Sequence, residues 1–136
     1  MTVGGLARMT VAVQPRYGGE PDLGALAVDL RRAVVGELPV AQRLAARERS
    51  TGRLVAAAPR IVWHTATDAA ILELRADDSP GLLYKAAHAL EEAGADVRAA
   101  RISTLGGAVV DAFYLVGEWS PAQRAAVEAA VLRHLQ

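Results

Sequence analysis

Apolar and polar residues alternate along residues 70–76, with Leu72 and Leu74 on one side of the backbone and Glu73 and Arg75 on the other. Successive side chains of a strand point to opposite faces, so this period of two predicts a strand with one buried face. The alternation stops at the acidic residues that follow position 76. This strand opens the most strongly patterned part of the chain.

A helical pattern follows the strand. Ser79 is a residue type that caps the free amides of a helix, and Pro80 suits the first helical position, where no intrahelical hydrogen bond is lost. Leu83 and Leu90 lie on one apolar stripe, and Gly94 suits the left-handed position after a helix end. We therefore expect a helix that begins at Pro80 and stops at Gly94.

Two extended runs follow this helix, at residues 96–105 and 108–116. The Gly106-Gly107 pair between them suits a tight hairpin. A further helix is expected over residues 120–135. The element order of this part is strand, helix, strand, strand, helix.

The first part of the chain is patterned more loosely. Residues 6–13 predict a strand that has no earlier strand to pair with, and residues 22–37 predict an amphipathic helix capped by Asp22. A charged helix is expected over residues 40–49, and a Gly/Ala/Pro-rich linker over residues 51–59. A short strand at residues 60–64 then leads into the patterned part.

Composition limits the classes of protein. The 136 residues have room for one domain and part of another, and 52% hydrophobic residues with 4% aromatics predict a core of Ala, Val and Leu. Fifteen basic and fifteen acidic residues cancel, so no net charge attracts nucleic acid or a membrane surface. Cysteine is absent, which excludes disulfides and thiolate chemistry, and neither a signal peptide nor a membrane span is evident. We expect a cytoplasmic protein.

Catalytic and metal-binding patterns are absent from the sequence. His64, His88 and His134 share no metal-ligand spacing, and the one suggestive local pair is His64 with Asp68. No serine lies in a nucleophile motif, and neither His-Asp nor Asp-x-Asp occurs. We therefore predict no catalytic residues, no metal ligands and no cofactor.

A basic cluster has two interpretations. Arg43, Arg47, Arg49 and Arg53 fall on and after the charged helix, and the first two lie one turn apart. They suit phosphate or an acidic partner surface. The interleaved Glu48, the scarcity of aromatic residues and the neutral total charge favour a solvated helix face instead.

Three motifs within residues 72–114 carry a resemblance: Asp-Ser-Pro-Gly-Leu-Leu-Tyr at 78–84, Ala-Arg-Ile-Ser-Thr at 100–104 and Val-Asp-Ala-Phe-Tyr at 110–114. In combination they resemble an ACT domain, a small module that senses amino acids. The segment is most similar to the C-terminal tandem ACT pair of the bifunctional PII uridylyltransferase/uridylyl-removing enzymes. This resemblance implies an α+β, ferredoxin-like ACT domain, an antiparallel sheet with two helices on one face.

The resemblance also suggests a domain division. An ACT domain ends in a strand beside its first strand, but this chain stops after a helix, so we expect a permuted edge strand at 60–64 within a domain at 60–136. Residues 4–13 share the hairpin-then-strand order of residues 106–115. We therefore interpret residues 1–50 as the C-terminal half of a preceding ACT-like unit with a connecting helix, residues 51–59 as a linker, and the chain as a fragment of a longer protein.

The family binds amino acids at the turn before the first helix. There the helix amides suit an α-carboxylate, Asp78 suits the α-amino group, and Gly81 lets a ligand approach the backbone. Alternatively, Asp78 and Ser79 only cap the helix, and Arg98 and Arg101 are solvent-facing rather than ligand contacts. Asp111 is expected to be surface-facing or hydrogen-bonded to the next strand. The candidate ligand-binding residues are Asp78, Ser79, Pro80, Gly81, Leu82 and Arg98.

The resemblance implies a non-catalytic regulatory region that binds a small amino acid, glutamine in the first place, and controls catalytic domains elsewhere in an enzyme that acts on the PII signalling protein. A homo-oligomer formed by ACT pairing is also implied. One alternative is a dimerisation module without a ligand. Another is the ACT region of an amino-acid biosynthetic or stringent-response enzyme.

Overall fold

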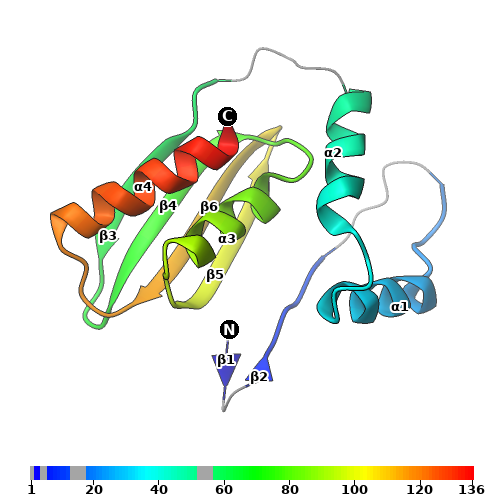
Figure 1. Cartoon of the computed structure of the whole chain (residues 1–136), viewed down its shortest axis with the longest axis horizontal. Coiled ribbons are helices and arrows are strands. Elements are labelled where there is room, and N and C mark those ends of the chain that lie inside the picture. The colour runs from blue at the N-terminus through cyan, green and yellow to red at the C-terminus, as the bar shows by residue number, and fades with distance from the viewer. Residues whose placement is uncertain (1, 4–5, 13–17, 52–56) are drawn as a thin grey trace.

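The structure is a computed structural model that describes residues 2–3, 6–12, 18–51 and 57–136. The second half of the chain forms a sheet of four strands with two helices packed against it (Figure 1). Its elements are β3 (Arg60–Thr65), β4 (Ala69–Asp77), α3 (Leu82–Glu92), β5 (Val97–Leu105), β6 (Ala108–Val116) and α4 (Pro121–Leu135).

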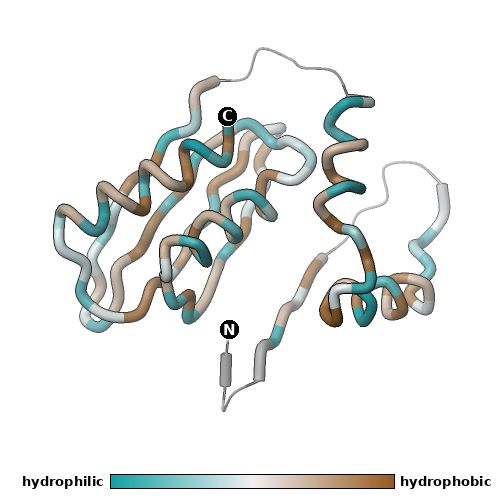
Figure 2. The backbone as a smooth tube through the Cα atoms, in the orientation of Figure 1, coloured by the Kyte–Doolittle hydropathy of each residue, from teal (hydrophilic) through white to brown (hydrophobic). Residues whose placement is uncertain are grey.

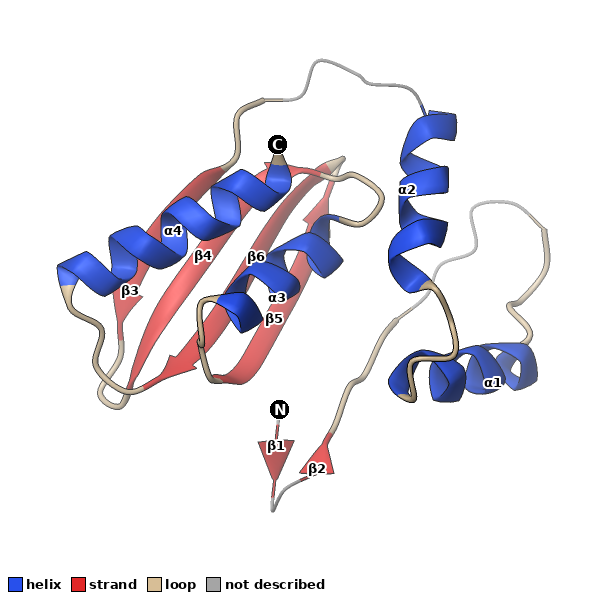
Figure 3. Ribbon diagram, viewed as in Figure 1, coloured by secondary structure: helices blue, strands red, loops and turns tan. Residues whose placement is uncertain are grey.

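All neighbouring strands of this sheet are antiparallel, in the order β3-β4-β6-β5. The edge strand β3 pairs with β4 from Arg60 opposite Arg75 to Thr65 opposite Ala70, so the antiparallel pairing expected for residues 60–64 is present. Both helices cover the same face of the sheet (Figure 3). This α+β arrangement is compatible with a ferredoxin-like fold.

The core lies between the sheet and the two helices. The alternation in β4 buries Leu72 and Leu74 completely, as predicted, and leaves Arg75 exposed. Ala86 and Ala89 of α3 are completely buried, so the side of this helix that packs in the core carries small side chains as well as Leu90. The buried cluster consists of Leu72, Leu74, Ala86, Ala89, Leu90, Phe113, Leu115, Val127 and Val131.

The start of α3 differs from the prediction. The helix begins at Leu82 rather than Pro80, its N-cap is Gly81, and no side chain caps it. The predicted Ser79 cap is therefore wrong. The Leu82 amide instead donates to the Ser79 carbonyl over 3.2 Å, which closes a turn and places Gly81 at φ +84°, a left-handed conformation that glycine adopts without strain. Gly94 follows the helix at φ +70°, as expected.

The first part of the chain contains β1 (Thr2–Val3), β2 (Leu6–Ala7), α1 (Leu23–Val34) and α2 (Val40–Thr51). The strand predicted over residues 6–13 is wrong for residues 8–12: β2 ends at Ala7 after pairing with β1, because a strand continues only where a neighbour satisfies its backbone. The described residues do not include residue 13, the Gly4-Gly5 pair, Arg53 or most of the expected linker.

Helix α1 is amphipathic but uncovered. Asp22 caps it as predicted, accepting from the amides of Gly24 and Ala25 at 2.9 and 3.1 Å. None of its residues is buried, and Leu23 and Val34 are 75% and 78% exposed. Figure 2 shows apolar positions along this helix, which lies apart from the sheet and its two helices.

One ion pair connects α1 to α2, and another connects α2 to the sheet region. Arg43 of α2 contacts Asp29 of α1 at 3.1 Å, and Glu48 of α2 contacts Lys85 of α3 at 2.8 Å. Arg43 of the basic cluster thus has an acidic partner within the chain, and the interleaved Glu48 has a basic one. No helix among the described residues combines the length and the apolar character needed to cross a membrane.

Candidate functional site

The turn between β4 and α3 is fixed to the hairpin between β5 and β6, which lies at the same end of the sheet. The Asp78 amide donates to the carbonyl of Gly107 over 2.8 Å, which ties the turn to the β5–β6 hairpin. Because Gly81 has no side chain, it cannot cap α3, and the first turn of the helix has no side-chain acceptor. The helix start therefore presents backbone amides and the positive end of its dipole.

A cavity of about 430 Å³ opens beside this turn. Its wall combines the turn, the exposed side of the first turn of α3, the hairpin ends of β5 and β6, and one residue of α2. Four predicted ligand-binding residues line it, Asp78, Ser79, Gly81 and Leu82, whereas Pro80 belongs to the same turn without lining it. The lining residues are Leu44, Asp78, Ser79, Gly81, Leu82, Leu83, Tyr84, Ala87, Ile102, Thr104, Val109 and Asp111.

Asp111 gives this cavity its chemical character. Its side chain is 1% exposed, and its Oδ1 atom has no hydrogen-bond partner within the described residues. The pKa of Asp111 is raised above its usual value, and burial of the carboxyl group is the main cause. The nearby Asp78 carboxylate also raises this pKa, whereas a hydrogen bond with the backbone of Ser103 lowers it. Of the two alternatives for Asp111, the surface-facing one is wrong, because this residue shares the helix-facing side of β6 with Phe113 and Leu115. The other is confirmed, because Asp111 has a hydrogen bond with the backbone of Ser103 on the neighbouring strand β5.

Two carboxyl groups on one small cavity favour a cationic group between them. A positive charge would relieve the mutual repulsion of Asp78 and Asp111 and supply a partner for Oδ1 of the latter. The amides at the start of α3 lie on the same wall and favour a negative group. The cavity can thus hold a small molecule that carries both charges.

Comparison with known proteins gives the chain a wider context, although no protein-family model matches it. The chain is 43% identical over 115 aligned residues to the bifunctional uridylyltransferase/uridylyl-removing enzyme of Streptomyces coelicolor, a match that covers 80% of this chain and 14% of that enzyme. The enzyme of the same name from Mycobacterium tuberculosis strain H37Rv is 34% identical over 149 aligned residues, covering 96% of this chain and 18% of the enzyme. The chain is homologous to a segment of these enzymes.

The segment spans less than a fifth of each uridylyltransferase/uridylyl-removing enzyme in these comparisons. A solved structure of an unknown protein from Galdieria sulphuraria aligns with 46% of this chain and 38% of its own, at 20% identity and a TM-score of 0.40. That likeness is too low to define a shared fold.

The remaining predicted contact, Arg98, lies away from the cavity. It is near the beginning of β5, while the cavity is at the end of that strand, and its guanidinium contacts Asp68 at 2.6 Å. Arg101 is exposed and lies opposite Ala112, on the sheet face away from the helices. In this chain, the cavity is thus built from the turn, α3, the β5–β6 hairpin and one residue of α2, without either arginine.

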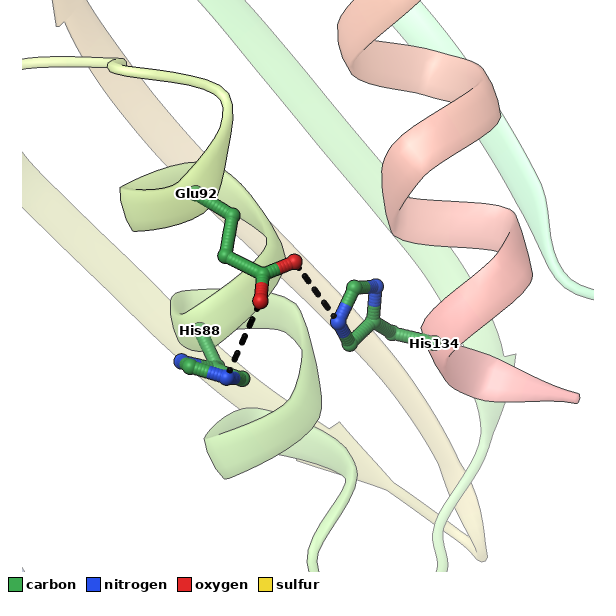
Figure 4. A group of neighbouring side chains, drawn as sticks. All are labelled: His88, Glu92 and His134. Carbon is green, nitrogen blue, oxygen red and sulfur yellow. Dashed lines mark ion pairs between the residues drawn. The ribbon is translucent and has the colours of Figure 1, made fainter.

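The histidines are placed differently from the sequence-based interpretation. His64 contacts Glu73 at 3.2 Å rather than Asp68, because the β3–β4 register places it within reach of that carboxylate. A hydrogen bond from Arg75 lowers the pKa of Glu73. His88 and His134, which are far apart in sequence, lie together with Glu92 (Figure 4). The i,i+4 spacing of His88 and Glu92 was the one local signal for this group.

Proposed function

We propose that this chain is an ACT-type regulatory region of a uridylyltransferase/uridylyl-removing enzyme and that it binds a small amino acid, glutamine in the first place. Catalytic domains elsewhere in such an enzyme would respond to the bound amino acid and act on the PII signalling protein. Support comes from the homology to a segment of these enzymes and from the motifs at residues 78–84, 100–104 and 110–114.

One observation carries the proposal: Asp111, a buried carboxyl group without a partner for one oxygen, lines the same cavity as a second carboxyl group, Asp78. This cavity lies beside an uncapped helix start. An α-amino acid has the matching charges. Its ammonium group binds between the two carboxylates, and its carboxylate accepts from amides of the first turn of α3 other than that of Leu82, which already donates to Ser79. The volume of about 430 Å³ lies within the usual range of small-molecule sites.

The other lining residues suit a short polar side chain. Leu44 and Leu82 provide apolar walls for methylene groups, and the Thr104 hydroxyl is a donor and an acceptor for a terminal amide. Glutamine satisfies both requirements. Binding in this position also joins α2, α3 and the β5–β6 hairpin, so the ligand favours the arrangement in which these elements are together.

The test is calorimetric titration of the purified chain with glutamine, with glutamate, asparagine and leucine as comparison ligands. We expect saturable glutamine binding that Asp111→Asn weakens by about tenfold or more, since the ammonium group loses a buried counter-charge. The matched control is Asp68→Asn, which removes an exposed carboxylate on the far end of the sheet and leaves binding unchanged. Saturable binding that Asp111→Asn does not weaken, or the absence of binding to any of these amino acids by the folded chain, contradicts the proposal.

A second function, assembly without a ligand, is favoured by a separate observation. The sheet face opposite α3 and α4 carries half-buried apolar residues, among them Ile71, Val110 and Tyr114, and the helices cover only the other face (Figure 1). A second copy of the chain would cover this face. Size-exclusion chromatography with light scattering of the chain and of Tyr114→Lys distinguishes the two: assembly predicts a dimer that the lysine converts to a monomer, whereas amino-acid binding alone predicts no change.

A further inference from the structure

The seam between α3 and α4 brings three potential metal ligands together. His88 and Glu92 are separated by one turn of α3, and His134 lies in the last turn of α4 (Figure 4). The seam beneath them is fixed by buried residues of both helices, Leu90 of α3 and Val127 and Val131 of α4. The backbone positions of the three side chains are therefore set by core packing.

The geometry of the three side chains suits one small cation. Glu92 Oε2 lies 3.1 Å from His134 Nε2, and Glu92 Oε1 lies 3.5 Å from His88 Nε2. One ligand atom from each of the three residues can be chosen so that all three lie within 4.8 Å of one another. In a tetrahedral zinc site, bonds of about 2.1 Å separate neighbouring ligand atoms by roughly 3.4 Å. Small rotations of the side chains are enough to close the site.

The hydrogen bond at Nδ1 of His134 determines that Nε2 is the nitrogen available to a metal ion. Nδ1 lies 3.0 Å from the carbonyl oxygen of Ala130, and a carbonyl only accepts, so Nδ1 carries the hydrogen. In the neutral imidazole, Nε2 then has a lone pair that faces the lone pairs of the Glu92 carboxylate. His134 Nε2 and Glu92 Oε2 are then two acceptors only 3.1 Å apart. This arrangement requires a positive charge, either between the two atoms or on one of the two groups. A metal ion supplies it while both groups stay deprotonated.

His88 has a similar but looser set of outer contacts. Its Nε2 faces Glu92, while its Nδ1 lies 3.7 Å from a carboxylate oxygen of Glu91. Histidine ligands of metals commonly donate their second N–H to a carboxylate or a backbone carbonyl, which fixes the ring and increases its basicity. Here the carbonyl of Ala130 occupies this outer position for His134, whereas Glu91, at 3.7 Å, lies beyond hydrogen-bond distance of His88 Nδ1.

We propose that His88, Glu92 and His134 bind a divalent transition-metal ion, Zn²⁺ in the first place. Two imidazole nitrogens and one carboxylate are the ligand types that such ions prefer over Mg²⁺ or Ca²⁺. The side chains are partly exposed, with 44%, 55% and 26% of their surfaces accessible in the order named, so an ion enters from solvent and keeps a position for water. The bound ion links α3 to α4 and stabilises the folded chain.

The test is a titration of the full chain, with any polyhistidine tag removed, with ZnCl₂ by calorimetry and by thermal unfolding. We expect one ion per chain and a rise in the melting temperature that a chelator reverses. His134→Ala and Glu92→Gln each weaken binding by about tenfold or more. The matched control is His64→Ala, which removes the third histidine of the chain, an exposed residue that also contacts a carboxylate, and leaves the affinity unchanged.

A spectroscopic readout keeps the test independent of stability. Co²⁺ replaces Zn²⁺ in such sites and gives visible absorption that depends on its ligands, so His88→Ala and His134→Ala are expected to abolish the bands at a Co²⁺ concentration that saturates the unaltered chain. Circular dichroism establishes that each variant is folded. Absence of saturable binding to the folded chain, or binding that persists in the double variant of His88 and His134, overturns the proposal.

Discussion

Helices α1 and α4 make an instructive comparison, because both are capped by a side chain and both carry apolar residues, yet they contribute differently to the structure. Helix α4 buries Val127, Ala130 and Val131 against the sheet and α3, whereas α1 buries none of its residues. Local sequence thus suffices to form a helix in each case. What makes one of them part of a core is the sheet that it covers.

The same contrast separates the two regions of the chain. Residues 57–136 contain every residue of the buried cluster. Residues 18–51 are connected to them by contacts that include the ion pair of Lys85 with Glu48, and Leu44 of α2 lines the same cavity as Gly81. Both tryptophans, Trp63 and Trp119, belong to the sheet region, where they stack at 6.5 Å. Tryptophan fluorescence therefore reports on that region alone, and circular dichroism reports on all four helices.

The largest expected effect is a truncation in the core. Leu72→Ala removes a completely buried side chain and leaves a cavity, so we expect the free energy of unfolding to fall by about 2–5 kcal/mol. Urea unfolding followed by tryptophan fluorescence measures it. The matched control is Leu26→Ala in α1, half exposed, for which we expect a change below about 0.5 kcal/mol. Equal losses for the two leucines would show that α1 belongs to the same cooperative unit.

Next in size is the effect of the buried carboxyl group. The pKa of Asp111 is raised above 3.8 in the folded state, so the folded protein binds this proton more tightly than the unfolded chain does. The free energy of unfolding that this proton contributes is fully present below about pH 3.8. It is lost as the pH rises through the folded-state pKa. Asp111→Asn should remove this loss and increase stability at pH 7 by about 1–3 kcal/mol. Urea midpoints measured from pH 4 to pH 8 test it, and parallel pH profiles for the two proteins would contradict it. Asp68→Asn serves as the exposed control.

The two helix caps give a smaller and more direct contrast. Ser120 accepts from the Gln123 amide in a capping box at the start of α4, so Ser120→Ala is expected to cost about 1 kcal/mol in the fluorescence-detected unfolding. Asp22→Ala removes the cap of α1 and should leave that transition unchanged, while circular dichroism shows a loss of helix signal. A fall in the fluorescence midpoint of Asp22→Ala would mean that α1 supports the core.

The smallest effect expected is that of the ion pair between the regions. Lys85 and Glu48 are both about one third exposed, so a double-mutant cycle with alanine at each position should give a coupling free energy of about 0.2–1 kcal/mol that decreases with added salt. The pair of Arg98 with Asp68, which lies within the sheet region, is the comparison cycle. A larger coupling for Lys85 and Glu48 would indicate that α2 is held more firmly than its exposure suggests.

Much of the sheet region could be predicted from the sequence because its signals are local. The alternation around Leu72, the glycine pair at 106–107 and the glycine after α3 each fix an element or its end without reference to the rest of the chain. The start of α3 could not be predicted from Ser79, because the turn that precedes the helix uses the Ser79 carbonyl and a left-handed glycine rather than the serine hydroxyl.

The two features missed in the candidate sites depend on tertiary packing. Both faces of β6 carry apolar residues, with Val109 and Phe113 on one face and Val110 and Tyr114 on the other. The periodicity of this strand therefore does not predict whether the face that carries Asp111 is the buried one. Only the packing of α3 and α4 decides that it is buried. His134 likewise meets His88 because the two helices lie side by side, a contact between positions that the sequence does not connect.

The position of β3 has a consequence for how the chain folds. This edge strand directly precedes β4, and the connection between them is short, so the outer pair of the sheet closes as a hairpin. An edge strand supplied from beyond α4 would need most of the region to be in place before it could pair. Since folding rates rise as the sequence distance between contacting residues falls, we expect the local hairpin to speed folding and to offer the later strand β6 a ready template.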